Sequence, residues 1–248
     1  MARIQLRDTT IYIQDGLSGA AAINDAGGVV ATDTTATIDA VVLNTDDTDL
    51  VPVGARLTFA GDTQVYTVTA RTPASTSPTT DITFTPAKVA GADNADDDVI
   101  TFLPQRITIK IGDGDLSWTE ARNFEYDLDR DRLDTVRQGE DVPVSVELAF
   151  TFEYVTTESG KAITPVDAIK RTGEATEWVS SSSDLCEPYA VDIYVIHDIP
   201  CGTDQDQDFL FPDFRYETLD FSLADASISV SGQCNVTEIT TTRATDIV

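Results

Sequence analysis

Hydrophobic and polar residues alternate over one long stretch in the second half of the chain. Between positions 144 and 154 the apolar residues fall on every second position, and polar residues occupy the other phase. A period of two over this length predicts an extended strand with one buried face and one solvated face. The expected buried set is Val144, Val146, Leu148, Phe150, Phe152 and Tyr154, and the polar set is Ser145, Glu147, Thr151 and Glu153.

Similar alternation flanks a long stretch of different composition. Ile11 and Ile13 alternate near the N-terminus, and the pattern resumes over residues 107–111. Between them, residues rich in Ala, Thr, Asp and Gly hold short strand-like pieces at 35–43, 56–59, 64–69, 82–85 and 99–102. We therefore expect residues 17–103 to form a small β-barrel or sandwich, inserted into a loop of a host domain made of residues 1–16 and 104–248. The strands on either side of the insertion should lie next to each other.

The remaining pattern predicts a mainly β host domain, a β-sandwich or barrel with one short flanking helix. Thr164 and Pro165 are a helix start signal, with Asp167 as the acid in the first turn, and predict a helix that runs to Arg171. A strand or helix is expected at 174–179. Further strands are expected at 189–197, 214–223 and 227–237, with a β-bulge near Thr218, where the apolar phase slips.

The chain is strongly acidic, with a formal net charge of -27. Asp supplies 32 of its 43 acidic residues, which favours many turns between strands because Asp competes with the helical backbone. The acidity argues against tight nucleic-acid binding, since phosphate binding needs clustered Lys and Arg. It suits either a soluble surface from a saline habitat or a surface that must not adhere to DNA. We expect no membrane span and no secretory leader.

No set of residues typical of an enzyme or a cofactor site emerges. The one histidine, His197, ends the apolar face of a strand, and no nucleophile elbow, phosphate loop or dinucleotide fingerprint occurs. The three cysteines lack zinc-ligand spacing. We expect Cys234 to be a buried thiol, and we favour reduced thiols over a bridge between Cys186 and Cys201. The sequence therefore predicts no enzymatic activity, no cofactor and no metal.

Acidic loops raise the question of calcium, which prefers clustered carboxylates. Asp127, Asp129 and Asp131 have the spacing that opens a calcium loop, but the glycine and the closing glutamate that such a loop needs are absent. The acids at 93–98 and 113–115 are expected to be solvated turn residues, with weak ion binding as the alternative.

A segment that carries charges of both signs precedes the long strand. Residues 124–141 read FEYDLDRDRLDTVRQGED, and four of the chain's 12 arginines lie in or next to this arm. Arginine pairs well with carboxylates, but an isolated exposed pair contributes only about 0–1 kcal/mol. We expect the arm to dock on a neighbouring, acidic copy of the same protein, with an ordinary flexible loop as the alternative. The residues concerned are Arg122, Arg130, Arg132, Asp134, Arg137, Glu140 and Asp141.

The order of these features resembles that of tailed-bacteriophage major tail tube proteins. The resemblance rests on residues 112–155, on the helix TPVDAIKR, and on the three strands that follow it. It implies a tail-tube-like β-sandwich or barrel with a flanking helix and a long charged loop that reaches an adjacent ring. The inserted domain departs from the family's pattern in its position, so its role is open.

The resemblance implies a structural virion protein whose hexameric rings stack into a hollow tail tube. Its partners would be further copies, the tape-measure, tail terminator and baseplate or tail-tip proteins, and a sheath protein if the tail is contractile. The tube would assemble in the host cytoplasm and reside in the virion tail. DNA would pass through without tight binding, because acids on the polar strand faces, with Glu147 and Glu153 as leading candidates, would repel its phosphates.

Two other classes of protein stay open. An extracellular, adhesive β-sandwich with calcium on its turn acids would melt in a calcium-dependent manner. A phage decoration or baseplate protein of related fold would form small oligomers and not long tubes.

Overall fold

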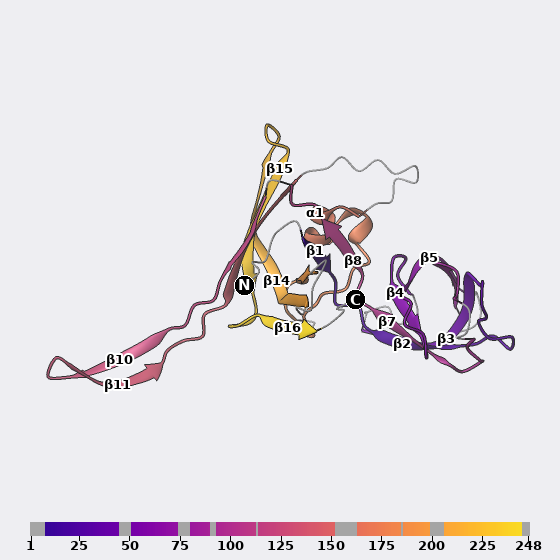
Figure 1. Cartoon of the computed structure of the whole chain (residues 1–248), viewed down its shortest axis with the longest axis horizontal. Coiled ribbons are helices and arrows are strands. Elements are labelled where there is room, and N and C mark those ends of the chain that lie inside the picture. The colour runs from indigo at the N-terminus through magenta and orange to yellow at the C-terminus, as the bar shows by residue number, and fades with distance from the viewer. Residues whose placement is uncertain are drawn as a thin grey trace. The chain divides into compact units, whose positions relative to one another are not determined.

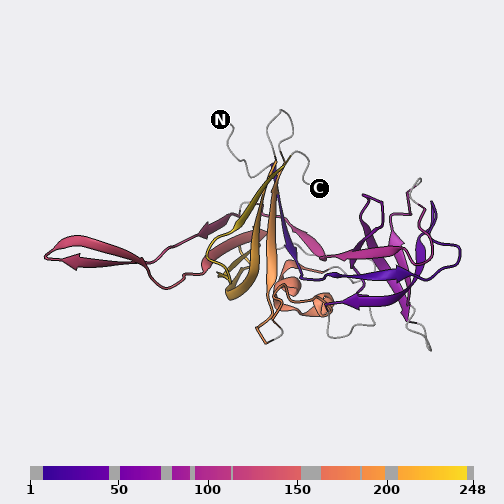
Figure 2. The same cartoon turned by 90° about the horizontal axis from the view of Figure 1, so that it is seen from below.

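The computed structural model describes residues 8–44, 51–73, 80–89, 93–112, 114–151, 163–184, 186–198 and 206–244 of the 248-residue chain. The chain divides into two compact units, drawn in Figures 1 and 2. The sheet unit comprises residues 1–14, 106–175 and 181–248, and the barrel unit comprises residues 15–105 and 176–180. The inserted domain was expected to consist of residues 17–103 alone. The barrel unit also includes residues 176–180, which follow much later in the chain.

The sheet unit contains an eight-stranded antiparallel sheet in the order β8-β1-β13-β14-β15-β12-β9, with β16 also paired to β14. β1 lies beside β8, with Ile11 opposite Ile109 and Ile13 opposite Ile107, as the returning pattern predicted. The strands are β1 (Thr9–Gln14), β8 (Arg106–Ile109), β9 (Leu116–Thr119), β12 (Val144–Thr151), β13 (Val191–His197), β14 (Asp206–Ser222), β15 (Ser227–Cys234) and β16 (Thr240–Ala244).

The alternation on β12 is confirmed as far as Thr151. The apolar residues Val144, Val146, Leu148 and Phe150 are at most 1% exposed, while Ser145 and Glu147 face solvent. Residues 152–154 lie outside the described part of the chain. The strand pairs with β15, where Cys234 lies opposite Val144 and is buried as expected. Burial raises the pKa of the Cys234 thiol to about 12. Cys186 is exposed and free, and Cys201 is not among the described residues.

The predicted helix and the predicted β-bulge are both present. The strand or helix expected at 174–179 does not form. In α1 (Pro165–Lys170), the Thr164 hydroxyl accepts from the Asp167 N–H at 3.1 Å, and the Asp167 carboxylate accepts from the Thr164 N–H at 3.3 Å. The register of β14 against β15 shifts between Tyr216 and Thr218. After α1 comes only a short 3-10 turn, η2 (Gly173–Ala175). Among the described residues no helix is long and apolar enough to cross a membrane.

The barrel unit is a closed six-stranded barrel in the order β2-β3-β6-β5-β4-β7. Its core holds a cluster of Phe59, Tyr66 and Phe84, whose ring centroids lie 5.2–5.4 Å apart in edge-to-face geometry. The strand β2 was missed because its sequence GAAAI carries little apolar contrast. The strands are β2 (Gly19–Ile23), β3 (Thr35–Leu43), β4 (Arg56–Phe59), β5 (Tyr66–Pro73), β6 (Thr80–Thr85) and β7 (Val99–Leu103).

Asp15 ties together the distant pieces of the barrel unit. Its carboxylate is fully buried and accepts from the backbone N–H groups of Leu17, Gln105 and Val179 at 3.1, 2.7 and 3.3 Å. The side-chain amide of Gln105 also donates to it, at 3.0 Å. Burial raises the pKa of Asp15 to about 7 although these donors act in the opposite direction.

Candidate self-assembly surfaces

The charged arm is a β-hairpin and not an irregular loop. β10 (Phe124–Asp129) and β11 (Arg132–Gln138) pair as a separate two-stranded antiparallel sheet, visible in Figures 1 and 2. The two residues at its tip, Arg130 and Asp131, have φ values of 49° and 64°, as a two-residue hairpin turn of type I′ requires. The abundance of charge hid a period-two pattern in FEYDLD that predicts a strand.

One face of the hairpin is apolar and open to solvent. Cross-strand partners share a face, and the register pairs Tyr126 with Val136 and Leu128 with Leu133. Phe124 lies on the same face, two positions before Tyr126. The exposed fractions of these five residues are 47% for Phe124, 57% for Tyr126, 63% for Leu128, 69% for Leu133 and 56% for Val136. We call this set the apolar arm face.

The opposite face of the hairpin carries the charges. The guanidinium of Arg137 lies 3.5 Å from the Asp127 carboxylate, which also accepts from the Thr135 hydroxyl at 3.1 Å. Both partners of this ion pair are more than half exposed, so the pair adds little to stability. Within the part of the chain that the structure describes, Arg130 and Arg132 are exposed and form no ion pair.

The root of the arm makes polar contacts at the surface of the sheet unit. Arg122 forms an ion pair with Glu238 at 3.2 Å, and Gln138 donates to Asp141 at 3.2 Å. The other predicted arm residues, Asp134 and Glu140, are exposed. Asp134 is left without a cross-strand partner by a register shift, which makes it the extra residue of a bulge. The seven predicted residues therefore lie along one hairpin and its root, and not in a cleft.

A second surface is the polar face of the main sheet. Glu147 is exposed there, opposite Ser231 on β15 and Ser117 on β9. The register also brings Asp220 of β14 to this face, opposite Ser229 of β15. This acid was not among the predicted lumen residues. Glu153, the other predicted acid, lies outside the described residues. The face is rich in hydroxyl groups, and the Thr218 and Ser231 hydroxyls are hydrogen-bonded at 2.6 Å.

In the part of the chain that the structure describes, β8 and β9 are the two ends of the strand order, so each has one neighbour along it. Such edges present backbone donors and acceptors that can pair with another chain.

The acidic turns give no sign of a metal site. Asp93 accepts from the Ala31 N–H at 3.1 Å and Asp98 from the Ala95 N–H at 2.8 Å, so these acids cap turns. Within the described ranges, no group of three acidic, histidine or cysteine side chains could hold a metal ion. His197 is a buried side chain at the end of β13.

Comparison of the chain with protein-family models, with curated proteins and with solved structures finds no match.

Proposed function

We propose that this chain is the subunit of a tailed-bacteriophage tail tube, a structural protein that forms hexameric rings stacked around a lumen for DNA. The observation that carries the proposal is the apolar arm face on a separate hairpin. A two-stranded hairpin by itself is marginally stable in water, and this one has no strand layer of its own chain packed on either face among the described residues. A partner that covers it would stabilise it.

A second copy of the chain fits as that partner. Burial of a large apolar side chain contributes about 1.5–3 kcal/mol relative to exposure, so five such residues are a substantial driving force even after ordering costs. The exposed Arg130 and Arg132 at the tip would meet an acidic surface on any neighbouring copy, since the chain carries a net charge of -27. Open edges at β8 and β9 offer a further route to join sheets edgewise.

The polar sheet face suits a lumen through which DNA slides. It offers many short hydroxyl side chains, while the acids Glu147 and Asp220 would repel phosphate. In this role the protein resides in the virion tail, with the tape-measure protein inside the tube and terminator and tail-tip proteins at its ends.

The test compares purified full-length chains by negative-stain microscopy and sedimentation. Replacing Tyr126, Leu128 and Leu133 of the apolar arm face with serine should abolish rings and tubes and leave a folded monomer. The matched control replaces Val30, Val42 and Val99 of the barrel unit with serine, because these are also exposed apolar residues but lie outside the arm. The control should still form tubes.

Three outcomes would contradict the proposal. If the wild-type chain stays monomeric at high concentration, it does not self-assemble and is not a tube subunit. Small closed oligomers without tubes would favour a decoration or baseplate protein. Tubes from the arm variant would mean that the hairpin does not join the subunits.

A further inference from the structure

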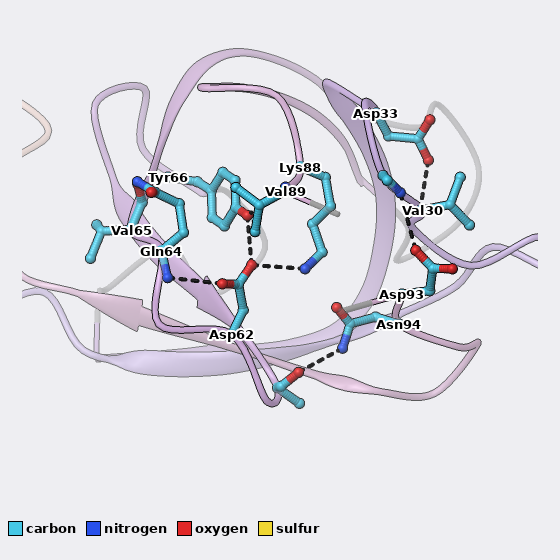
Figure 3. A network of polar contacts seen from close by, with 12 residues as sticks. Val30, Asp33, Asp62, Gln64, Val65, Tyr66, Lys88, Val89, Asp93 and Asn94 are labelled. Atoms are coloured by element: carbon cyan, nitrogen blue, oxygen red, sulfur yellow. Dashed lines mark hydrogen bonds and ion pairs between the residues drawn. The ribbon is translucent and has the colours of Figure 1, made fainter. Parts of the chain in front are cut away.

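The barrel unit encloses three polar side chains, those of Asp62, Lys88 and Asn94. The proposed assembly role gives these side chains no function. Figure 3 shows the side chains of Asp62, Lys88 and Asn94 pointing toward one another among the strands of the barrel unit. The side chain of Lys88 is 0% exposed and that of Asp62 is 4% exposed, and their Nζ and Oδ2 atoms are 2.8 Å apart. Asn94 is 4% exposed. An amine, a carboxylate and a carboxamide are therefore held together out of water.

Aromatic rings surround the amine of Lys88. Its Nζ atom lies 4.8 Å from the ring centroid of Phe59 and 5.8 Å from that of Tyr66. The Tyr66 hydroxyl donates to Asp62 at 2.6 Å, and the backbone N–H of Gln64 donates to the other carboxylate oxygen at 2.9 Å. The reactive groups are thus oriented by hydrogen bonds within a site of low polarity.

Asn94 is anchored but incompletely satisfied. Its Nδ2 donates to the Ala60 carbonyl at 2.9 Å and to the Asp98 carboxylate at 3.3 Å, and its backbone pairs with Val29 in both directions. Its Oδ1 atom is buried and has no hydrogen-bond partner. Figure 3 shows this oxygen on the side of Asn94 that points toward the Lys88 amine. A buried acceptor without a donor is unfavourable, so its position needs a reason.

We propose that Lys88 and Asn94 join in an intramolecular isopeptide bond, with Asp62 as the general acid and base. Asp62 first takes a proton from the Lys88 ammonium across their hydrogen bond, which leaves a neutral amine. The amine attacks Cγ of Asn94, so that an Nζ–Cγ bond forms and the Cγ–Nδ2 bond breaks. Asp62 relays protons from Nζ to the departing nitrogen, ammonia leaves, and no oxidant or reductant takes part.

Burial supplies the driving conditions for this step. At rest the hydrogen bonds from Lys88, Tyr66 and Gln64 outweigh the effect of burial and lower the pKa of Asp62 to about 2, so Asp62 is a carboxylate. Charges enclosed among aromatic rings are costly, and formation of the amide removes the lysine charge from the core. Positioning of the three groups replaces the activation that an amide needs in solution.

The test begins with the intact mass of the unfolded full-length chain. The bond removes one ammonia, about 17 Da, from the sequence mass. Trypsin does not cleave after an acylated lysine, so residues 72–106 should remain one peptide that carries the loss. The variant Asp62→Asn keeps both reacting side chains but lacks the general base, so it should show the full mass and be cleaved after Lys88.

Each alternative result overturns the proposal. A full wild-type mass means that the trio is an ion pair only. Loss of a water, about 18 Da, together with a cross-link between Lys88 and Asp62 would mean that Lys88 reacts with Asp62 and not with Asn94. Loss of ammonia with normal cleavage after Lys88 indicates a succinimide at Asn94 and no cross-link.

Discussion

The arm hairpin and the inserted barrel follow the same period-two pattern with opposite results. In the barrel, strands close on themselves, so the apolar positions of β4, β5 and β6 become a core in which Leu57, Val68 and Phe84 are at most 1% exposed. In the arm, two strands cannot close, and the apolar positions remain more than 40% exposed. Alternation specifies which face of a strand is apolar. The number of strands decides whether the chain can bury that face by itself.

The two regions also differ in how they hold charge. The barrel buries the pair of Lys88 and Asp62, whereas the arm leaves the pair of Arg137 and Asp127 in water. A buried pair whose partner is lost leaves an uncompensated charge, while an exposed pair loses almost nothing. Substitutions in the two pairs should therefore differ in their effect on stability, and the proposed assembly through the arm can be tested without unfolding the barrel.

The largest expected effect is on assembly. Reversing the two arm arginines without an ion pair, Arg130→Glu and Arg132→Glu, should abolish tubes by repelling the acidic neighbour while the monomer stays folded. Sedimentation velocity and circular dichroism measure the two properties. Arg171→Glu with Arg243→Glu makes the same charge change at exposed positions outside the arm. If the two double variants block tube formation equally, the net charge and not the arm controls assembly.

Next comes the stability of the barrel. Asp62→Ala leaves the buried Lys88 charge unpaired, which should lower the free energy of unfolding by about 3–5 kcal/mol. Asp127→Ala in the arm should leave it unchanged within error. Chemical denaturation can follow Trp178, which is buried in the barrel unit. Equal effects of the two substitutions would contradict the contrast between the pairs.

The last expected effect is a pH dependence within the barrel unit. The pKa of Asp15 is raised from 3.8 to about 7, so its contribution to stability is complete below pH 3.8 and is lost as pH rises through about 7. The pKa of Asp62 is lowered to about 2, so its contribution is present above pH 3.8 and is lost as pH falls through about 2. Asp15→Asn should flatten the stability profile between pH 4 and 7, which denaturation at several pH values measures. A profile as steep as that of the wild type would show that Asp15 is not the group that titrates there.

Local patterns predicted the elements whose signals are local. The strand at Val144 and the cap at Thr164 each depend on residues within a few positions, and the bulge near Thr218 appeared as a phase slip. The hairpin was missed although its alternation was present, because charged residues at every other position suggested an irregular loop. Its apolar face was therefore not considered as a binding surface.

Other features depend on contacts between distant residues, which no local pattern reveals. Lys88 reads as an ordinary surface lysine until its partner, 26 residues away, is known. Asp15 reads as a turn residue, but its donors come from Leu17, Gln105 and Val179, and the last of these is 164 positions along the chain. The membership of residues 176–180 in the barrel unit follows from the same long-range contacts.

The place where the insertion begins and ends has a practical consequence. Gln14 and Arg106 are paired neighbours on β1 and β8, so the two connections to the barrel leave from adjacent points of one ladder. A short reverse turn could bridge them after excision of the whole barrel, and a different folded cargo could take its place. The excision would also remove Asp15, and with it the hydrogen bond that its carboxylate accepts from the Val179 N–H, so any such display scaffold would need a new partner there.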